Sequence, residues 1–107
     1  MFMSEIFMLA RLKAKAGVEF SLEKELKDLV KATHSETGCL LYDLHRDLND
    51  LSQFVIIERF LSKEDLDAHY ASPHFSKHFS VISSLLEKDP EIIQLNSLQT
   101  GVKEKLL

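Results

Sequence analysis

The fold is decided by residues 36–75, which read ETGCLLYDLHRDLNDLSQFVIIERFLSKEDLDAHYASPHF. Two largely apolar runs of this stretch, 39–46 and 53–61, are separated by the turn-forming residues 47–50. Each run has the length of a strand, and alternate side chains of a strand point to opposite faces of its sheet. Both faces of the second run are largely apolar, which predicts a central strand that is covered on both sides.

Strict alternation assigns the faces of these two strands. In the first, Tyr42 is predicted to share a face with Leu40 and Leu44, whereas Cys39 lies on the other face. In the second, one face is predicted to carry Phe54, Ile56, Glu58 and Phe60.

Two short helices are predicted directly after the strands. Ser62 is suited to cap the first helix, because an acidic residue follows it three positions later. Ser72 is suited to cap the second, because Pro73 is favoured at the first helical position.

The flanking segments complete the pattern. Residues 5–15 alternate as a strand, and residues 20–37 have the apolar spacing of an amphipathic helix. Ser21 is a plausible N-cap for this helix. Gly38 is placed where a left-handed residue would end it.

Residues 92–98 are predicted to form the last strand, with Ile93 and Leu95 buried. The order β-α-β-β-α-β predicts an α+β fold, a ferredoxin-like split βαβ sandwich with an antiparallel sheet. We expect one domain over residues 1–100 and a flexible tail over residues 101–107.

The face of the sheet that the helices leave uncovered is also apolar. An apolar face of this size is rarely left in water, so we expect two sheets to pack together in a homodimer. The candidate residues on this face are Val55, Ile57, Ile93 and either Leu41 or Leu44.

Composition excludes several classes of function. The formal net charge of −4 argues against nucleic-acid binding, which needs concentrated Lys and Arg. There is no signal-peptide pattern and no apolar run of membrane length, so we expect a cytoplasmic protein without membrane contact. Cys39 is the single cysteine and fits a reducing compartment, either as buried packing or as a nucleophile.

The histidines are the first candidates for chemistry. His74 and His78 share a helix face and could bind Zn²⁺, but a site needs a third ligand, and no metal motif identifies one. We therefore expect no metal and no cofactor. His69 is predicted to point towards the core, either as a buried neutral residue or as a base near neutral pH.

Glu58 is the sharpest anomaly, because it is a carboxylate on an apolar face. It either pairs with Arg11 or Lys13 on a neighbouring strand, or it lies in a pocket with a raised pKa. Tyr42 could hydrogen-bond a ligand or Glu58. An aromatic-lined cavity and an ordinary core are both compatible with Phe7, Phe54, Phe60, Phe75 and Phe79.

Residues 4–98 resemble the antibiotic biosynthesis monooxygenase domain, a family that includes quinol monooxygenases of the bacterial YgiN type. The resemblance implies a dimeric α+β barrel with a pocket in each subunit between sheet and helices. The matching residues are Gly17, Glu36-x-Gly38-Cys39-x-x-Tyr42-x-x-x-Arg46-Asp47, Phe54-Val55-x-x-Glu58-Arg59 and Leu66-x-x-His69-x-x-Ser72-x-His74-Phe75.

The resemblance implies an activity. Family members often oxidise electron-rich phenols or quinols with O₂ and without metal or flavin, so the expected partners are a small aromatic substrate and O₂. By position, His69 is expected to act as the base and Glu58 as its orienting partner. The expected substrate contacts are Tyr42, His74, Phe60 and Phe75.

One departure from the family pattern concerns Phe60. Many members have Trp at this position, and the chain contains no Trp. The missing indole N–H is a donor that some monooxygenases of the family use. Two alternatives therefore stay open: a non-oxidative isomerase of a small carbonyl compound, and a small-ligand-binding domain without turnover.

Overall fold

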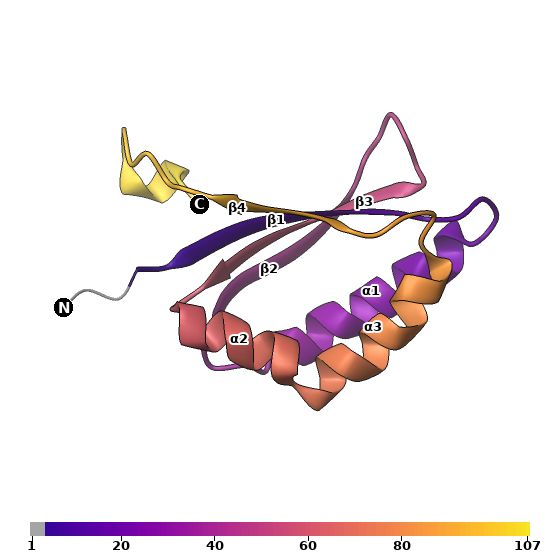
Figure 1. The fold of residues 1–107 in the computed structure, drawn as a ribbon. Coiled ribbons are helices and arrows are strands. Elements are labelled where there is room, and N and C mark those ends of the chain that lie inside the picture. The colour runs from indigo at the N-terminus through magenta and orange to yellow at the C-terminus, as the bar shows by residue number, and fades with distance from the viewer. Residues whose placement is uncertain (1–3) are drawn as a thin grey trace.

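The structure, a computed structural model, describes residues 4–107. The described chain forms a four-stranded antiparallel sheet of order β2-β3-β1-β4, with the three α-helices on one face (Figure 1). The elements are β1 (Ile6–Lys13), α1 (Glu19–Thr33), β2 (Cys39–Arg46), β3 (Gln53–Phe60), α2 (Lys63–Ala71), α3 (Pro73–Leu85), β4 (Glu91–Leu95) and the 3₁₀ helix η1 (Lys103–Lys105). This is the predicted α+β, ferredoxin-like architecture. None of the helices described is long and apolar enough to cross a membrane.

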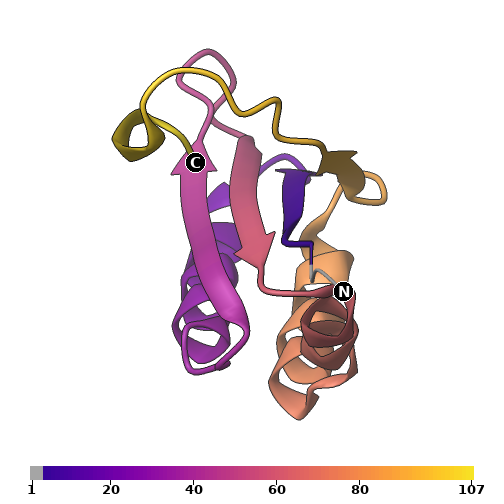
Figure 2. The same cartoon turned by 90° about the vertical axis from the view of Figure 1, so that its left-hand side faces the viewer.

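The core lies between the sheet and two columns of helix, one formed by α1 and the other by α2 and α3 (Figure 2). Ala10 of β1 lies opposite Ile56 of β3, and Leu12 lies opposite Phe54; all four are buried. Burial of each large apolar side chain contributes roughly 1.5–3 kcal/mol. The core residues of the helices are Leu22, Leu26, Leu29, Ile82 and, beyond the end of α3, Leu86.

A β-bulge in β2 corrects the predicted faces of this strand. The pairing with β3 shifts between Cys39 and Leu41, which makes Leu40 the extra residue. Cys39 therefore packs against the core on the same side as Tyr42, whereas Leu40 is exposed. The prediction from strict alternation was wrong because one inserted residue exchanges the faces of the residues before it.

Helix α1 begins and ends earlier than predicted. Its N-cap is Val18, without a side-chain cap hydrogen bond, and the predicted cap Ser21 lies inside the helix. The helix ends at Thr33, and a turn-rich loop connects it to β2. Gly38 at the end of this loop does not have the positive φ predicted for it.

Gly38 is instead required by a close approach between two segments. A Cβ atom on Gly38 would lie 2.2 Å from Cγ of Asp65, far inside van der Waals contact. The Asp65 carboxylate accepts a hydrogen bond from Ser62 at the start of α2. The absence of a side chain therefore lets the α1–β2 loop touch α2, and this loop carries Glu36.

The corner between α2 and α3 is fixed by one serine. Ser72 is both the C-cap of α2 and the N-cap of α3, which confirms the predicted cap. Its hydroxyl donates to the carbonyl of His69 and accepts from the amide of Phe75. Pro73 occupies the first helical position, and the predicted Ser62 cap of α2 is also confirmed.

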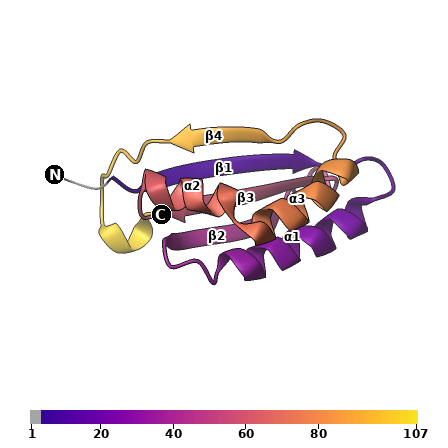
Figure 3. The ribbon, with the colours of Figure 1, turned by 60° about the horizontal axis from the view of Figure 1, so that its bottom comes forward.

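Strand β4 lies at the edge of the sheet, beyond the area that the helices cover (Figure 3). It is shorter than predicted and all five of its residues are exposed. Ile93 pairs with Leu9 and Leu95 with Phe7, so both point away from the helices. The predicted burial of Ile93 and Leu95 is therefore wrong for the single chain.

Candidate active site

A cavity of about 330 Å³ lies between the inner face of the sheet and the helices. This volume is at the lower end of the range for small-molecule sites. The side chains around it are mostly apolar. They are Ala10, Leu12, Tyr42, Ile56, Glu58, Pro90 and Ile92 from the sheet and the loop before β4, and Leu26, Leu29, Tyr70, Phe75, Phe79 and Ile82 from the helices.

Glu58 is the carboxylate of this cavity. It lies on the inner face of β3, is 3% exposed, and its Oε1 has no hydrogen-bond partner among the residues described. The alternative of a pair with Arg11 or Lys13 is wrong, because Arg11 pairs with Glu91 and Lys13 with Asp50, each at 2.9 Å. Burial, assisted by the negative charge of Glu36, raises the pKa of Glu58 to about 7.

Two phenols accompany Glu58. Tyr42 lies opposite it in the β2–β3 register and is buried. Burial and then the charge of Glu58 raise the pKa of Tyr42 above its usual value, and the same two causes raise the pKa of Tyr70 to about 12. Both hydroxyls therefore stay protonated at neutral pH and can donate hydrogen bonds to a developing oxyanion. Sequence reasoning missed Tyr70, which follows the singled-out His69 directly.

The predicted aromatic contacts are divided between the cavity and the core. Phe75 lines the cavity, and its ring stacks on Phe79 with a centroid distance of 5.3 Å and an interplanar angle of 9°. Phe60 does not line it; this ring is fully buried against the rings of Tyr42 and His69. The position at which family members often have Trp therefore belongs to the packing beneath the cavity in this chain.

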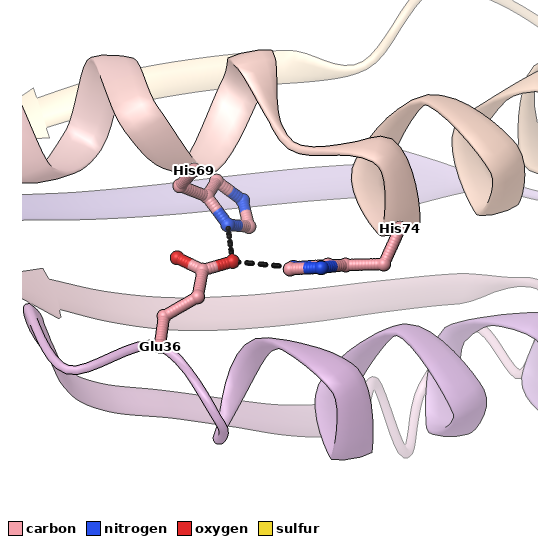
Figure 4. A group of neighbouring side chains, drawn as sticks. All are labelled: Glu36, His69 and His74. Atoms are coloured by element: carbon pink, nitrogen blue, oxygen red, sulfur yellow. Dashed lines mark hydrogen bonds and ion pairs between the residues drawn. The ribbon is translucent and has the colours of Figure 1, made fainter.

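His69 and His74 meet at a carboxylate that sequence reasoning did not select. Oε2 of Glu36 lies 2.9 Å from Nδ1 of His69 and 2.5 Å from Nε2 of His74 (Figure 4). Neither histidine is among the residues that line the cavity. His69 is thus oriented by Glu36, in place of the predicted Glu58. The sequence indicates Glu36 only as part of a family motif and places it in the predicted helix 20–37, whereas it lies in the loop after α1.

His69 is surrounded by aromatic rings and shielded from solvent. The ring is 1% exposed, and its centroid lies 5.3 Å from those of Tyr42 and Tyr70 and 5.0 Å from that of Phe75. Burial lowers the pKa of His69, and the hydrogen bond to Glu36 opposes this shift. His69 therefore supports the side chains of the cavity wall from behind.

The remaining candidates have simpler environments. His78 contacts Glu25 at 3.1 Å, so the predicted pair His74 and His78 bonds to two different carboxylates. Burial, with the charge of Glu36, raises the pKa of Cys39 to about 11. The thiol is then protonated at neutral pH, which favours packing over nucleophilic attack.

The comparisons with known proteins agree on one family. Residues 5–80 match the profile of the family described as antibiotic biosynthesis monooxygenase. The Mycobacterium tuberculosis protein Rv0793 is 28% identical over 95 residues, which cover 89% of this chain and 93% of that protein.

Solved structures have the same fold. The structure of Rv0793 has a TM-score of 0.85, with 26% identity over 92% of this chain and 100% of that chain. The structure of PA3566 from Pseudomonas aeruginosa also has a TM-score of 0.85, with 34% identity and the same coverage. A third, described as an antibiotic biosynthesis monooxygenase, has a TM-score of 0.84, with 26% identity over 88% of this chain and 99% of that chain. The chain therefore belongs to the antibiotic biosynthesis monooxygenase family.

Proposed function

We propose that this protein is a cofactor-independent monooxygenase that oxidises a small aromatic phenol or quinol with O₂ in the cavity beside Glu58. The observation that carries the proposal is a buried carboxylate with an unpartnered oxygen in an apolar cavity. A base with a pKa of about 7 combines sufficient ionisation at neutral pH with high proton affinity. The family description and the resemblance to quinol monooxygenases support the oxidative chemistry.

The reaction begins with removal of a proton from the substrate hydroxyl by Glu58. The hydroxyls of Tyr42 and Tyr70 donate hydrogen bonds to the resulting oxyanion, and the apolar walls exclude water. The phenolate transfers one electron to O₂, and the two radicals combine to form a C–O bond. The proton taken up by Glu58 returns to this peroxide, and loss of water from the resulting hydroperoxide leaves a carbonyl. The attacked carbon, which is CH₂ in the keto tautomer of the substrate, and O₂ thus give C=O and H₂O without an external reductant.

His69 has a different role in this proposal from the one predicted from the sequence. It packs against Tyr42 and Phe75, whereas its Nδ1 is occupied by Glu36. We therefore assign the base to Glu58 and make His69 a positioning residue.

Oxygen uptake tests the proposal. Chelator-treated protein is mixed with reduced naphthoquinols and flavonoid-like phenols, and O₂ consumption is followed with an electrode. Glu58→Gln is expected to lower kcat by a factor of about 10²–10⁴. The matched control is Glu64→Gln, an exposed residue in the first turn of α2 that does not line the cavity, which should leave kcat unchanged. Full activity of Glu58→Gln would contradict the proposal.

The pH profile gives a second readout. Because Glu58 must be ionised to accept a proton, kcat/KM is expected to rise with pH and to level off above the pKa of about 7. A profile that is flat between pH 5 and 8 would argue against this base.

A non-oxidative isomerase is the second candidate, because a buried carboxylate beside phenol donors also suits proton abstraction next to a carbonyl. Turnover that proceeds equally well without O₂ would favour it. Binding of the aromatic compounds without any turnover would instead identify a ligand-binding domain.

We also propose that two copies pair through the outer face of the sheet. The side chains there that are exposed or partly exposed are Leu9, Val55, Ile57, Ile93 and Leu95. Light scattering should give the mass of a dimer, and Ile57→Glu should give that of a monomer. The control is Val81→Glu, an exposed position on α3. A dimer that persists in Ile57→Glu would place the interface elsewhere.

A further inference from the structure

Three side chains from three segments converge outside the cavity. Glu36 comes from the α1–β2 loop, His69 from α2 and His74 from the start of α3 (Figure 4). One carboxylate oxygen and one ring nitrogen of each histidine lie within 4.8 Å of one another. The Gly38 contact and the Ser72 corner described above hold these three segments together.

The donor set suits a divalent transition metal ion. Two imidazoles and one carboxylate are typical ligands of Zn²⁺, Co²⁺ and Fe²⁺. Bonds of about 2.1 Å place two tetrahedral ligands roughly 3.4 Å apart. The carboxylate oxygen of Glu36 lies 2.9 Å and 2.5 Å from the two nitrogens, so these two distances would lengthen by roughly 0.5 Å and 0.9 Å to admit an ion.

An ion can reach this cluster from solvent. The side chain of His69 is buried, but those of Glu36 and His74 are 16% and 26% exposed. The hydrogen bonds to Glu36 use the same nitrogens that would face a metal, so on metal binding each neutral imidazole would carry its proton on its other ring nitrogen.

We propose that Glu36, His69 and His74 form a binding site for a divalent transition metal ion, with water completing the coordination. The site is separate from the cavity, because none of the three lines it. The proposal does not rest on the proposed oxidation, which the chelator-treated protein should carry out. Bound metal would tie the α1–β2 loop to the α2–α3 corner and stabilise the cavity wall.

The test uses full-length protein without a histidine tag, freed of metal with a chelator. Co²⁺ is titrated at pH 7.5 while its visible d–d absorption is recorded, and Zn²⁺ binding is measured by calorimetry. We expect one ion per chain and visible bands from imidazole and carboxylate ligation. Glu36→Gln and His74→Ala should weaken binding at least tenfold. Zn²⁺ should raise Tm of the unaltered protein and leave Tm of Glu36→Gln unchanged.

The matched controls are Glu25→Gln and His78→Ala, which alter the neighbouring carboxylate–histidine pair. Both should bind Co²⁺ like the unaltered protein. His69 is left unchanged because a substitution of this buried ring endangers the fold. The proposal is overturned if no saturable binding occurs, if Glu36→Gln binds as tightly as the unaltered protein, or if His78→Ala removes the binding.

Discussion

Two carboxylates on this side of the sheet are treated in opposite ways. Glu58 faces an apolar cavity and has an oxygen without a partner within residues 4–107, whereas Glu36 is bonded to two imidazoles. A buried group that lacks a partner reduces stability but is available to a ligand; a satisfied group organises the segments around it. Glu58 is therefore suited to bind and deprotonate a ligand, and Glu36 to hold its neighbouring segments in place.

The two carboxylates also interact electrostatically. The negative charge of Glu36 is the second cause, after burial, of the raised pKa of Glu58. Neutralising Glu36, by substitution or by a bound cation, is therefore expected to move the pKa of Glu58 towards its ordinary value.

The largest expected effect concerns Glu58 and pH. With a pKa of about 7 in the folded chain against 4.5 when unfolded, the unfolded chain binds fewer protons between these values. The contribution of Glu58 to stability is thus fully present below pH 4.5 and is lost as pH rises from 4.5 through 7. Above pH 7 the free energy of unfolding is expected to be lower by about 3 kcal/mol than at low pH. Denaturant unfolding of the unaltered protein and Glu58→Gln, compared from pH 4 to 8, checks this. If the difference between their free energies of unfolding does not change with pH, Glu58 does not have a raised pKa, and its contrast with Glu36 is lost.

The partner experiment is Glu36→Ala. This change leaves the buried Nδ1 of His69 without its acceptor, so we expect a loss of about 2 kcal/mol. Urea unfolding measures it, with Glu25→Ala as the control, because its partner His78 is more exposed than His69. An equal loss in both variants would mean that the cluster has no special structural role.

Gly38→Ala tests the contact that brings the Glu36 loop to α2. The added Cβ would overlap the Asp65 side chain, and the loop or the side chain must move. We expect a loss of about 1–2 kcal/mol in urea unfolding. Thr37→Ala, an exposed neighbour in the same loop, should be close to neutral. A neutral Gly38→Ala would show that the loop can shift freely.

The smallest effect is expected for Ser72→Ala. The variant lacks the cap of α3 and the bond to the carbonyl of His69, which should cost about 1 kcal/mol. Ser76→Ala, an exposed position within α3, is the control for a loss of hydroxyl alone. Tm is measured by thermal unfolding, and an equal decrease of Tm in both variants would contradict a special role for Ser72.

The sequence predicted features with local causes. Alternation placed Glu58 on an apolar face, and the Ser62 and Ser72-Pro73 patterns placed both helix starts. These signals depend on a few neighbouring residues and are therefore readable along the chain.

Features that depend on distant contacts were not predictable in the same way. The bulge at Leu40 follows from the pairing of whole strands, and the role of Gly38 follows from its contact with Asp65. The role of Glu36 depends on α2 and α3, which bring two histidines within hydrogen-bond distance of it. For the same reason the sequence could not reveal that His69 lies behind the cavity wall.

We expect the edge strand β4 to act as a gate for the cavity. Ile92 of β4, and Pro90 just before this strand, form part of the cavity wall, and among the described strands β4 is hydrogen-bonded to β1 only. Such a segment opens at low free energy, so ligand traffic is expected to follow the fraying of β4 while β3 and Glu58 stay fixed. Under conditions in which every opening of β4 leads to exchange of its amide hydrogens, their exchange rate equals the opening rate and would set an upper limit on how fast a ligand enters and leaves.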